Sequence, residues 1–547
     1  TAGVEYVNLN VFNLFMQHTE GEYRFRSIDD FESGKIDRIY YNNSAGTNNE
    51  NDAGANFSYS IGTLYMQDDF NVTDDLTVKF GLRYDFWDTD DVPTPNQSFE
   101  DRYGFSNNGS VDGLSLLQPR FGFNYVVSEN MEVRGGVGLY SGGAPNVWIS
   151  NAYSNDGVTN IGTREFNIPG FTGNLFTTEF NGGGQPIFDV PQALFDRVAN
   201  TTGGDGQVNA TDTNFEVPRE WKYSLGMTYV SDDSYVITAD LLFADKVDAA
   251  IVTDLALRDS GRDYPDGRPV NEQISSRRGG NDFLLTNVAF DSGSSTVLSL
   301  GINKDYDNGI DFSASYAYTK ATDVNPMTSA VAYSNYIGVA VSDPLDPQVA
   351  TTNYETRDRF TLQLGYEAEF IDGFSTRFSL FGTASSGQPY SLTYNNARLF
   401  NDANSFRSLV YIPEVNDPNV VWEDPADEAA FNQFVDDNGI QRGEISQRNT
   451  FNAAWWTKFD IRVQQQLPGF TDDHSASAFF VIKNLGNLLN DDWGTLKQVN
   501  FRTQSIINPS LNDDGQYVYS NFNAPNDGVA SRDPSLWEVR IGVKYNF

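Results

Sequence analysis

Recurring stretches of alternating side chains constrain this sequence more than any other feature. In about fourteen stretches, every second residue is aliphatic or aromatic and the residues between are polar, charged or glycine. Successive side chains of a β-strand point to opposite faces, so each stretch predicts a strand with one apolar and one polar face. The predicted strands are residues 4–15, 59–70, 76–86, 119–127, 131–141, 221–230, 235–245, 296–303, 310–319, 360–370, 374–383, 456–467, 476–483 and 535–547.

The last stretch, residues 535–547, carries the pattern clearly. One face holds Trp537, Val539, Ile541, Val543, Tyr545 and Phe547, and the other holds Glu538, Arg540, Gly542, Lys544 and Asn546. A transmembrane barrel strand needs about 9–11 tilted residues with lipid outside, a polar lumen inside and aromatics near the water boundaries. The stretch meets these conditions. Its terminal phenylalanine resembles the end signal of bacterial outer-membrane barrels, which implies recognition by the barrel assembly machinery.

The connections between the predicted strands alternate strictly between short and long. Residues 71–75 and 128–130 are tight turns, whereas residues 142–218 and 385–454 are long polar segments. Outer-membrane barrels have short periplasmic turns and long extracellular loops, whereas a sandwich, propeller or solenoid gives no reason for this alternation. The sequence therefore predicts an all-β, transmembrane antiparallel β-barrel in contact with outer-membrane lipid. An even number of strands places both ends of the barrel on the periplasmic side.

Composition excludes several other classes of protein. The chain has 36 Lys and Arg against 74 Asp and Glu, a net charge of −38, and such a surface repels nucleic acid. An aromatic content of 14% argues against a disordered acidic chain. The absence of cysteine excludes disulfides and thiolate metal sites. No apolar run approaches the roughly 18 residues of a membrane helix, but a barrel strand needs only every second residue apolar.

No catalytic constellation is visible, so the chain is not expected to be an enzyme. His18 and His474 are far apart and lack the spacing of a zinc motif.

No cofactor is expected. The acidic stretches Asp402 to Asp417 and Asp436 to Gly439 leave loop calcium as a minor alternative, because neither has a full set of ligands at the right spacing. Asp, Asn and Gly clusters normally form turns.

Charged residues on the polar faces of the strands are the candidates for contact with a substrate or a plug. They are Lys79, Arg83, Asp85, Glu132, Arg134, Lys458, Asp460, Arg462, Glu538, Arg540 and Lys544. Both signs interleave, so a wall of internal salt bridges is the simpler interpretation of the set. The loop aromatics Trp148, Trp422 and Trp455 are candidates either for gripping a ligand or for anchoring at the membrane interface.

Five strings resemble TonB-dependent receptors of the bacterial outer membrane. Residues 65–85 read YMQDDFNVTDDLTVKFGLRYD, which resembles the family's barrel signature of an aromatic-x-Gln-Asp strand, a tight turn and a Gly-Leu-Arg-Tyr strand. Four more resemble the Oar-like branch: SYAYTKATD at 315–323, SGQPYS at 386–391, WTKFDIR at 456–462 and NLGNLLNDDWG at 484–494. They span most of the chain in matching order.

The resemblance implies a 22-stranded barrel with an N-terminal plug, driven by the TonB complex, in the cell outer membrane of a Gram-negative bacterium. Residues 1–547 would then be the C-terminal portion of the barrel, with the plug and the first barrel strands outside this sequence. A complete porin-like barrel of fourteen strands fits the even strand count equally well. The matching strings favour the first interpretation.

Three functions are compatible with the sequence. The first is an active importer of a scarce substrate, with peptides or other oligomers favoured over iron chelates because no loop carries an iron-ligand cluster. The second is a surface adhesion or structural barrel whose loops bind partners, and a passive porin-like channel is a third possibility. The substrate itself is unknown from the sequence.

Overall fold

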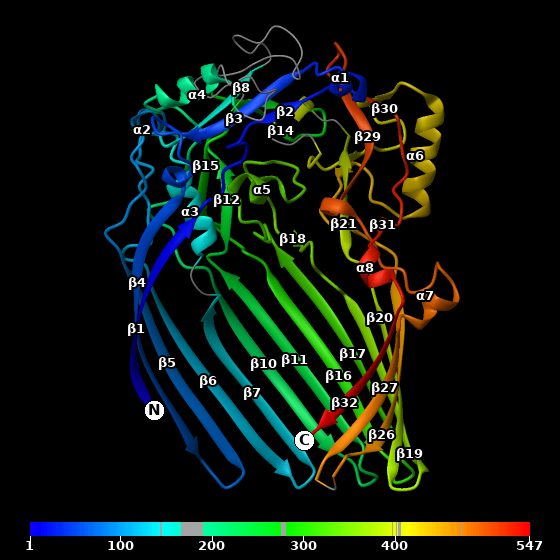
Figure 1. Ribbon diagram of the computed structural model, residues 1–547. Helices are drawn as coiled ribbons and strands as arrows, with labels where there is room; N and C mark the ends of the chain where they lie inside the picture. The colour runs from blue at the N-terminus through cyan, green and yellow to red at the C-terminus, as the bar shows by residue number, and fades with distance from the viewer. Residues whose placement is uncertain are drawn as a thin grey trace.

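The structure, a computed structural model, describes residues 1–142, 145–165, 190–274, 280–395, 398–400, 402, 406–471 and 473–547. One large antiparallel sheet dominates it (Figure 1). Its strands follow one unbroken order: β1 (Ala2–Asn13), β4 (Ala55–Asn71), β5 (Leu76–Asp88), β6 (Ser115–Ser128), β7 (Met131–Ser141), β10 (Arg219–Val230), β11 (Val236–Val247), β16 (Ser294–Asp305), β17 (Ile310–Asp323), β19 (Asp358–Ile371), β20 (Phe374–Ser385), β26 (Trp456–Pro468), β27 (Ser475–Lys483) and β32 (Glu538–Asn546). A fifteenth strand, β18 (Ala350–Thr351), pairs with β17 off this path.

The predicted strands are confirmed, and most extend beyond the predicted bounds at their loop ends, whereas β1 ends at Asn13, two residues before its predicted end. Strand β7 has the predicted bounds, whereas β4 begins at Ala55 because its pairing with β1 continues upward to Asn13. The last strand begins at Glu538, later than predicted, because Arg532–Ser535 form the short helix α8. The chain ends lie near the end of the sheet that carries the short turns (Figure 1).

The register of the sheet gives it one apolar and one polar face. Leu300 lies opposite Tyr316 on the next strand, and Tyr316 lies opposite Phe360 on the strand after that. On this outer face the apolar side chains are open to the surroundings: Ile541 is 79% exposed. Such a row of exposed apolar side chains is expected of a surface that contacts lipid.

Aromatic rings on the outer face pack over glycines of neighbouring strands. A Cβ on Gly62 would lie 2.1 Å from Cζ of Phe86, and a Cβ on Gly382 would lie 2.8 Å from Cε1 of Phe459. Gly62 is opposite Phe86 in the register, and Gly382 is opposite Phe459. The missing side chain thus makes room for the ring, which covers backbone that glycine would otherwise leave bare.

The sheet has two edges among the described residues. Strand β1 pairs with β4 on one side, and β32 pairs with β27 on one side. No pairing joins β1 to β32 in the part of the chain that the structure describes. The sheet therefore presents two rows of backbone N–H and C=O groups at its ends.

The described residues of the long connections fold together at the other end of the sheet, and we call them the loop cap; the connections are residues 14–54, 89–114, 142–218, 248–293, 324–357, 386–455 and 484–537. Its helices are α1 (Ile28–Glu32), α2 (Gln97–Tyr103), α3 (Asn146–Ser154), α4 (Gln192–Ala199), α5 (Ala332–Ile337), α6 (Pro425–Asp437), α7 (Leu485–Leu489), α8, and the 3-10 turns η1 (Glu50–Ala53), η3 (Arg398–Phe400) and η4 (Asn500–Arg502). Besides β18, its strands are β2 (Glu22–Arg24), β3 (Arg38–Ser44), β8 (Asn160–Glu165), β9 (Asn209–Thr211), β12 (Ala250–Asp254), β13 (Leu257–Asp263), β14 (Pro269–Gln273), β15 (Phe283–Asn287), β21 (Pro389–Tyr394), β22 (Tyr411–Ile412), β23 (Val420–Trp422), β24 (Glu444–Ile445), β25 (Phe451–Asn452), β28 (Lys497–Gln498), β29 (Thr503–Leu511), β30 (Tyr517–Ser520) and β31 (Val529–Ala530).

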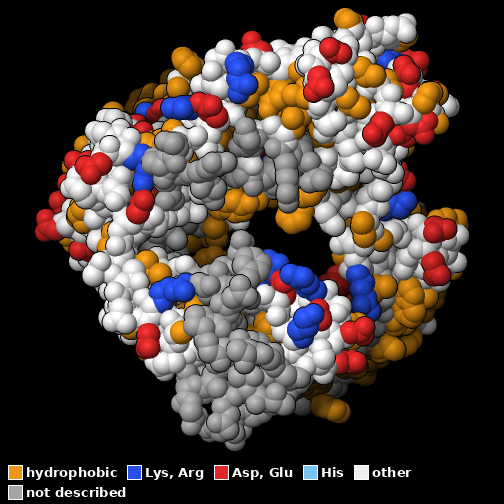
Figure 2. Space-filling model, turned by 90° about the horizontal axis from the view of Figure 1, so that it is seen from above, with side chains coloured by type: hydrophobic (Ala, Val, Ile, Leu, Met, Phe, Trp, Pro, Cys, Tyr) orange, Lys and Arg blue, Asp and Glu red, His pale blue; other side chains and the backbone are white. Residues whose placement is uncertain are grey.

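The hydrophobic cores of the molecule lie mainly in this cap. One core joins the upper ends of β4 and β5 to helices α3 and α5 and to β12 and β15. A second is built from the connections 386–455 and 484–537, with fully buried Tyr394, Phe431 and Tyr519. The sequence predicted these connections only as polar loops, so the cap adds a folded layer above the sheet. Seen from the cap side, the molecule is hollowed near its centre (Figure 2).

None of the described helices has the length and the apolar character that crossing a membrane requires.

Candidate functional site: the inner wall and the loop cap

The predicted lumen-facing charges share one face of the sheet. The register connects them strand by strand: Lys458 lies opposite Thr383, which lies opposite Thr361, and Arg540 lies opposite Val481, which lies opposite Arg462. This polar face, which we call the inner wall, is the one opposite the apolar row of Leu300 and Tyr316. All of the charged candidates therefore lie on the inner wall, as the alternation predicted.

Most of these charges have partners within the inner wall. The pairs are Lys79 with Asp69 at 3.4 Å, Arg83 with Asp85 at 2.9 Å and with Glu5 at 3.6 Å, Arg134 with Asp240 at 2.5 Å, Lys458 with Asp460 at 3.2 Å, and Glu538 with Arg540 at 2.5 Å and with Lys483 at 3.3 Å. Glu132 accepts a hydrogen bond from Asn124 at 2.7 Å, and Arg462 donates to Gln464 at 2.6 Å. Exposed pairs of this kind add little stability, so their main effect is to keep the wall polar and water-filled. Contact of any of them with a substrate stays a prediction.

Arg120 on β6 is an inner-wall charge that the sequence analysis left out. It occupies the inward position opposite Gly138 of β7, so the same alternation could have found it. Unlike Arg83 and Arg134, it has no carboxylate within ion-pair distance among the residues that the structure describes.

The three loop tryptophans lie in different settings. Trp148 of α3 packs against the first cap core, and its indole N–H donates to the carbonyl of Ser329 at 3.2 Å. Trp422 of β23 packs in the second core, with its ring 5.2 Å from that of Phe431. The structure therefore gives both a packing role in the cap. Trp455 is half-exposed, and its ring stacks 6.4 Å from that of the outer-face Phe360, a position that suits an anchor at the membrane interface.

A buried charge network ties separate connections of the cap together. Arg102 of α2 pairs with Asp282 at 3.0 Å, and the hydroxyl of Tyr103 donates to the same carboxylate at 2.8 Å. Asp282 also accepts from the backbone N–H of Val208 at 3.0 Å. These contacts join the connections 89–114, 142–218 and 248–293. The network links these connections, and removal of Asp282 would leave the buried guanidinium of Arg102 with one carboxylate partner fewer.

Asp254 at the end of β12 lies beside this network. Its carboxylate accepts hydrogen bonds from the backbone N–H groups of Ala256 at 2.9 Å and Asp282 at 3.3 Å, and from the side-chain amide of Asn281 at 2.5 Å. Burial is the main effect on it and raises its pKa from 3.8 to about 6, although the three hydrogen bonds oppose this. Asp254 is therefore a titrating group in the interior of the cap.

The hairpin β13–β14 links parts of the cap that are far apart in the sequence. Its Asp266 and Arg268 form a buried ion pair at 2.7 Å, and the guanidinium lies 4.7 Å from the ring centre of Phe400. The hydroxyl of Tyr264 donates to the carbonyl of Leu399 at 2.5 Å. The tip of this hairpin, from the connection 248–293, is thus embedded in the core of the connections 386–455 and 484–537.

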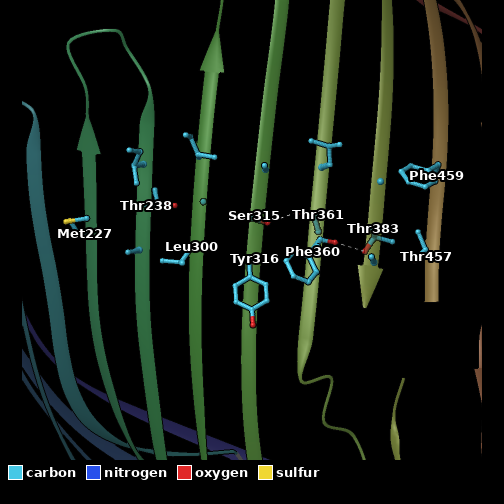
Figure 3. Close-up of a pocket in the computed structure, with 18 residues that line it drawn as sticks. Met227, Thr238, Leu300, Ser315, Tyr316, Phe360, Thr361, Thr383, Thr457 and Phe459 are labelled. Carbon is cyan, nitrogen blue, oxygen red and sulfur yellow. Dashed lines mark hydrogen bonds between the residues drawn. The ribbon is translucent and has the colours of Figure 1, made fainter. Parts of the chain in front are cut away.

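Two cavities bear on where a solute could bind. A groove of 720 Å³ runs over β10, β11, β16, β17, β19, β20 and β26 and is lined by apolar side chains; Tyr316 and Phe360 lie side by side in it, with ring centres 4.7 Å apart (Figure 3). Its apolar side chains, such as Leu300, Tyr316 and Phe360, belong to the outer face, whereas Thr361 and Thr383, which also border it, occupy inner-wall positions. The second cavity, 530 Å³, lies in the cap and is lined by polar groups that include Gln348, Arg357 and Gln447.

No group of three or more His, Asp or Glu side chains in the described ranges is arranged to hold a metal ion. The acidic stretches considered for calcium use their carboxylates within the protein. Asp402 pairs with Arg407, Asp417 accepts from the hydroxyl of Tyr411 at 2.7 Å, and Asp436 pairs with Arg442 at 2.9 Å. Part of the first stretch, residues 403–405, lies outside the described residues.

The sequence matches the model of a known protein family described as outer membrane beta barrel domain, over residues 1–479. The chain belongs to this family. As an outer membrane β-barrel domain, it is a protein of the Gram-negative outer membrane, and the fourteen-strand order and the apolar outer face are the features expected of it. No curated protein matches its sequence.

Several solved structures are similar to this outer membrane β-barrel domain at low sequence identity. The outer membrane transporter YddB from Escherichia coli has a TM-score of 0.45 and 9% identity, over 93% of this chain and 50% of that one. The FrpB iron transporter from Neisseria meningitidis gives 0.42 and 11%, over 99% and 52%. The siderophore receptor PirA from Acinetobacter baumannii gives 0.40 and 12%, over 85% and 45%. The chain spans about half the length of these proteins.

The raised pKa of Asp254 predicts that the cap loses stability as pH rises from about 4 to about 6. In this window the folded cap keeps the proton on Asp254, whereas the unfolded chain has already released it. A difference of about two pKa units corresponds to at most ~3 kcal/mol, all of it lost above the folded pKa. Hydrogen exchange of amides in β12 and β15, corrected for intrinsic rates, should show less protection at pH 7 than at pH 5. Asp254→Asn should flatten this response, and protection that rises with pH in the natural protein would contradict the account.

Proposed function

We propose that the chain is the outer-membrane part of a TonB-dependent importer that takes up a scarce solute. The observation that carries this proposal is the combination of a polar inner wall with a folded, internally braced cap above it. The five strings that resemble TonB-dependent receptors favour the same conclusion. A passive channel needs a wetted wall but gives no reason for a cap with several hydrophobic cores and buried ion pairs.

The cap supplies the capture step in this proposal. Its 530 Å³ cavity is lined by both a cation, Arg357, and a carboxylate, Glu355, together with the amides of Gln348, Gln447 and Asn452. Such a set can hydrogen-bond to amide, amine and carboxylate groups. We therefore favour peptides or other polar oligomers as the substrate.

We propose further that other strands of the same barrel pair with the edges β1 and β32. In hydrocarbon an unpaired backbone group costs several kcal/mol, and each edge strand carries a row of them. The resemblance to TonB-dependent receptors implies both these strands and a plug that gates the lumen and contacts TonB. The barrel assembly machinery would insert the whole barrel, with β32 as the strand that it recognises.

Uptake in cells separates this proposal from its alternatives. Cells that express the natural full-length protein should accumulate peptides of a labelled tryptic digest in the periplasm, and deletion of the tonB gene should reduce that accumulation at least tenfold. The expected loss reflects an energy-dependent gate. Accumulation that persists without TonB would indicate a passive channel, and surface binding without accumulation would indicate an adhesion protein. Uptake of a ferric chelate by the same cells is measured for comparison with uptake of the peptides.

Cross-linking tests the open edges. Cysteine pairs that join Val4, Tyr6 or Asn8 of β1 to Val539, Ile541 or Val543 of β32 should not form disulfides on oxidation of cells, because other strands separate the two edges. The pair Val4→Cys with Leu64→Cys is the positive control, since these residues are opposite each other in the β1–β4 register. Cross-linking of any β1–β32 pair as efficient as this control would show instead that fourteen strands close on themselves.

A further inference from the structure

One part of the inner wall combines two cations with several glycine positions on the neighbouring strands. Arg120 of β6 and Lys222 of β10 both lie opposite Gly138 of β7, one on each side. Adjacent strands are about 4.8 Å apart, so the two backbone positions are separated by about 10 Å. Both side chains are long enough to reach the space over Gly138.

Tyr140 lies between the two cations. Its ring covers Gly138, where a Cβ would lie 2.8 Å from Cε2 of the ring. The guanidinium of Arg120 is 4.9 Å from the ring centre, and Nζ of Lys222 is 5.9 Å from it. The aromatic face attracts both cations and holds them near each other despite their like charge.

Among the described residues, Arg120 differs from Arg83 and Arg134 in having no polar partner. Arg83 and Arg134 each pair with a carboxylate, and Nζ of Lys222 lies 3.3 Å from Glu220. In the described part of the chain, the guanidinium of Arg120 makes neither an ion pair nor a hydrogen bond, and its Nε is buried without an acceptor. A guanidinium carries five N–H donors in a fixed planar arrangement that matches carboxylate and phosphate groups.

Glycines form the floor next to these cations. Gly81 lies opposite Arg120, and Gly122 lies opposite Gly136, which is two residues before Gly138 on β7. A Cβ added at Gly122 would meet only one atom within 4 Å, a backbone oxygen at 3.6 Å, so the space above it is open. A ligand can approach the backbone closely here.

We propose that Arg120, Lys222 and Tyr140 form a binding subsite on the inner wall for a solute that carries carboxylate or phosphate groups. The chain as a whole has a net charge of −38, so its general field repels anions and only a local arrangement of this kind can retain one. The cations bind the anionic groups while the glycine floor gives the solute room. This subsite rests on the proposed import function, because the inner wall is the route that the solute would follow.

Calorimetry on the purified natural full-length protein in detergent, at low ionic strength, tests the subsite with two probes. Tricarballylate represents carboxylates and inorganic pyrophosphate represents phosphates. Binding of one probe or both by the natural protein, weakened at least tenfold by Arg120→Gln and by Lys222→Gln, supports the subsite and identifies its chemistry. Binding of neither probe, or equal binding by Arg120→Gln, would overturn it.

Two more variants separate the subsite from a general effect of charge or folding. Lys304→Gln removes a cation that also lies over tyrosine rings, 4.9 Å from Tyr235 and 5.3 Å from Tyr306, but near a short turn, and it should leave binding unchanged. Gly122→Leu keeps every charge and fills the floor, so it should weaken binding at least tenfold. Loss of binding in Lys304→Gln equal to that in Arg120→Gln would contradict the proposal.

The outcome is independent of the transport experiment, because binding is measured without TonB. If uptake depends on TonB but neither anion binds, the proposed subsite is wrong and the proposed importer is supported. If an anion binds specifically but uptake does not depend on TonB, the proposed importer is wrong and the proposed subsite is supported.

Discussion

Backbone hydrogen bonding within the sheet is the constraint on which the rest of this molecule depends. A strand in hydrocarbon has no water to satisfy its N–H and C=O groups, so each must pair with a neighbour. Antiparallel neighbours joined by short turns meet this need with little chain, as between β6 and β7. The same pairing fixes the register, and the register decides that Leu300, Tyr316 and Phe360 face one side while the charges face the other.

The pairing of the barrel strands does not determine how the cap folds. The middle of the sheet is open on both faces, so the hydrophobic cores form in the long connections, where several segments meet. Buried contacts such as those of Arg102 with Asp282 and of Tyr517 with Asp266 link these segments to one another. The sheet thus positions an internally braced cap over a polar hollow. This arrangement suits capture of a solute by the cap and its passage along the inner wall.

The sequence was sufficient for the sheet because its signal is local. The period of two residues predicts where the strands and short turns lie and which face Lys458 and Arg540 occupy. The cap could not be predicted in this way, because its contacts join distant residues: Tyr264 bonds to Leu399, and Asp266 to Tyr517. Trp148 and Trp422 stood in apparent loops, and only the packing of other connections around them reveals their place in the cores.

Arg120 illustrates a second limit of prediction from the sequence. Its inward position could be predicted from the strand pattern, but the absence of a carboxylate partner among the described residues could not, because that depends on which strands lie beside β6. Pairing of β7 with both β6 and β10 brings Lys222 to the other side of Gly138. Local alternation thus predicts which face a charge occupies, whereas the order of strands decides whether that charge is already neutralised.

The central claim is that one face of the sheet contacts lipid and the other contacts water. Spin labels placed one at a time along β16, from Ser295 to Ile302, in the natural protein in lipid bilayers test it most directly. Accessibility to oxygen should be highest at Thr296, Leu298, Leu300 and Ile302, and accessibility to a water-soluble nickel chelate should be highest at Ser295, Val297, Ser299 and Gly301. Equal accessibility to the nickel chelate at Leu298, Ser299 and Leu300 would contradict the account.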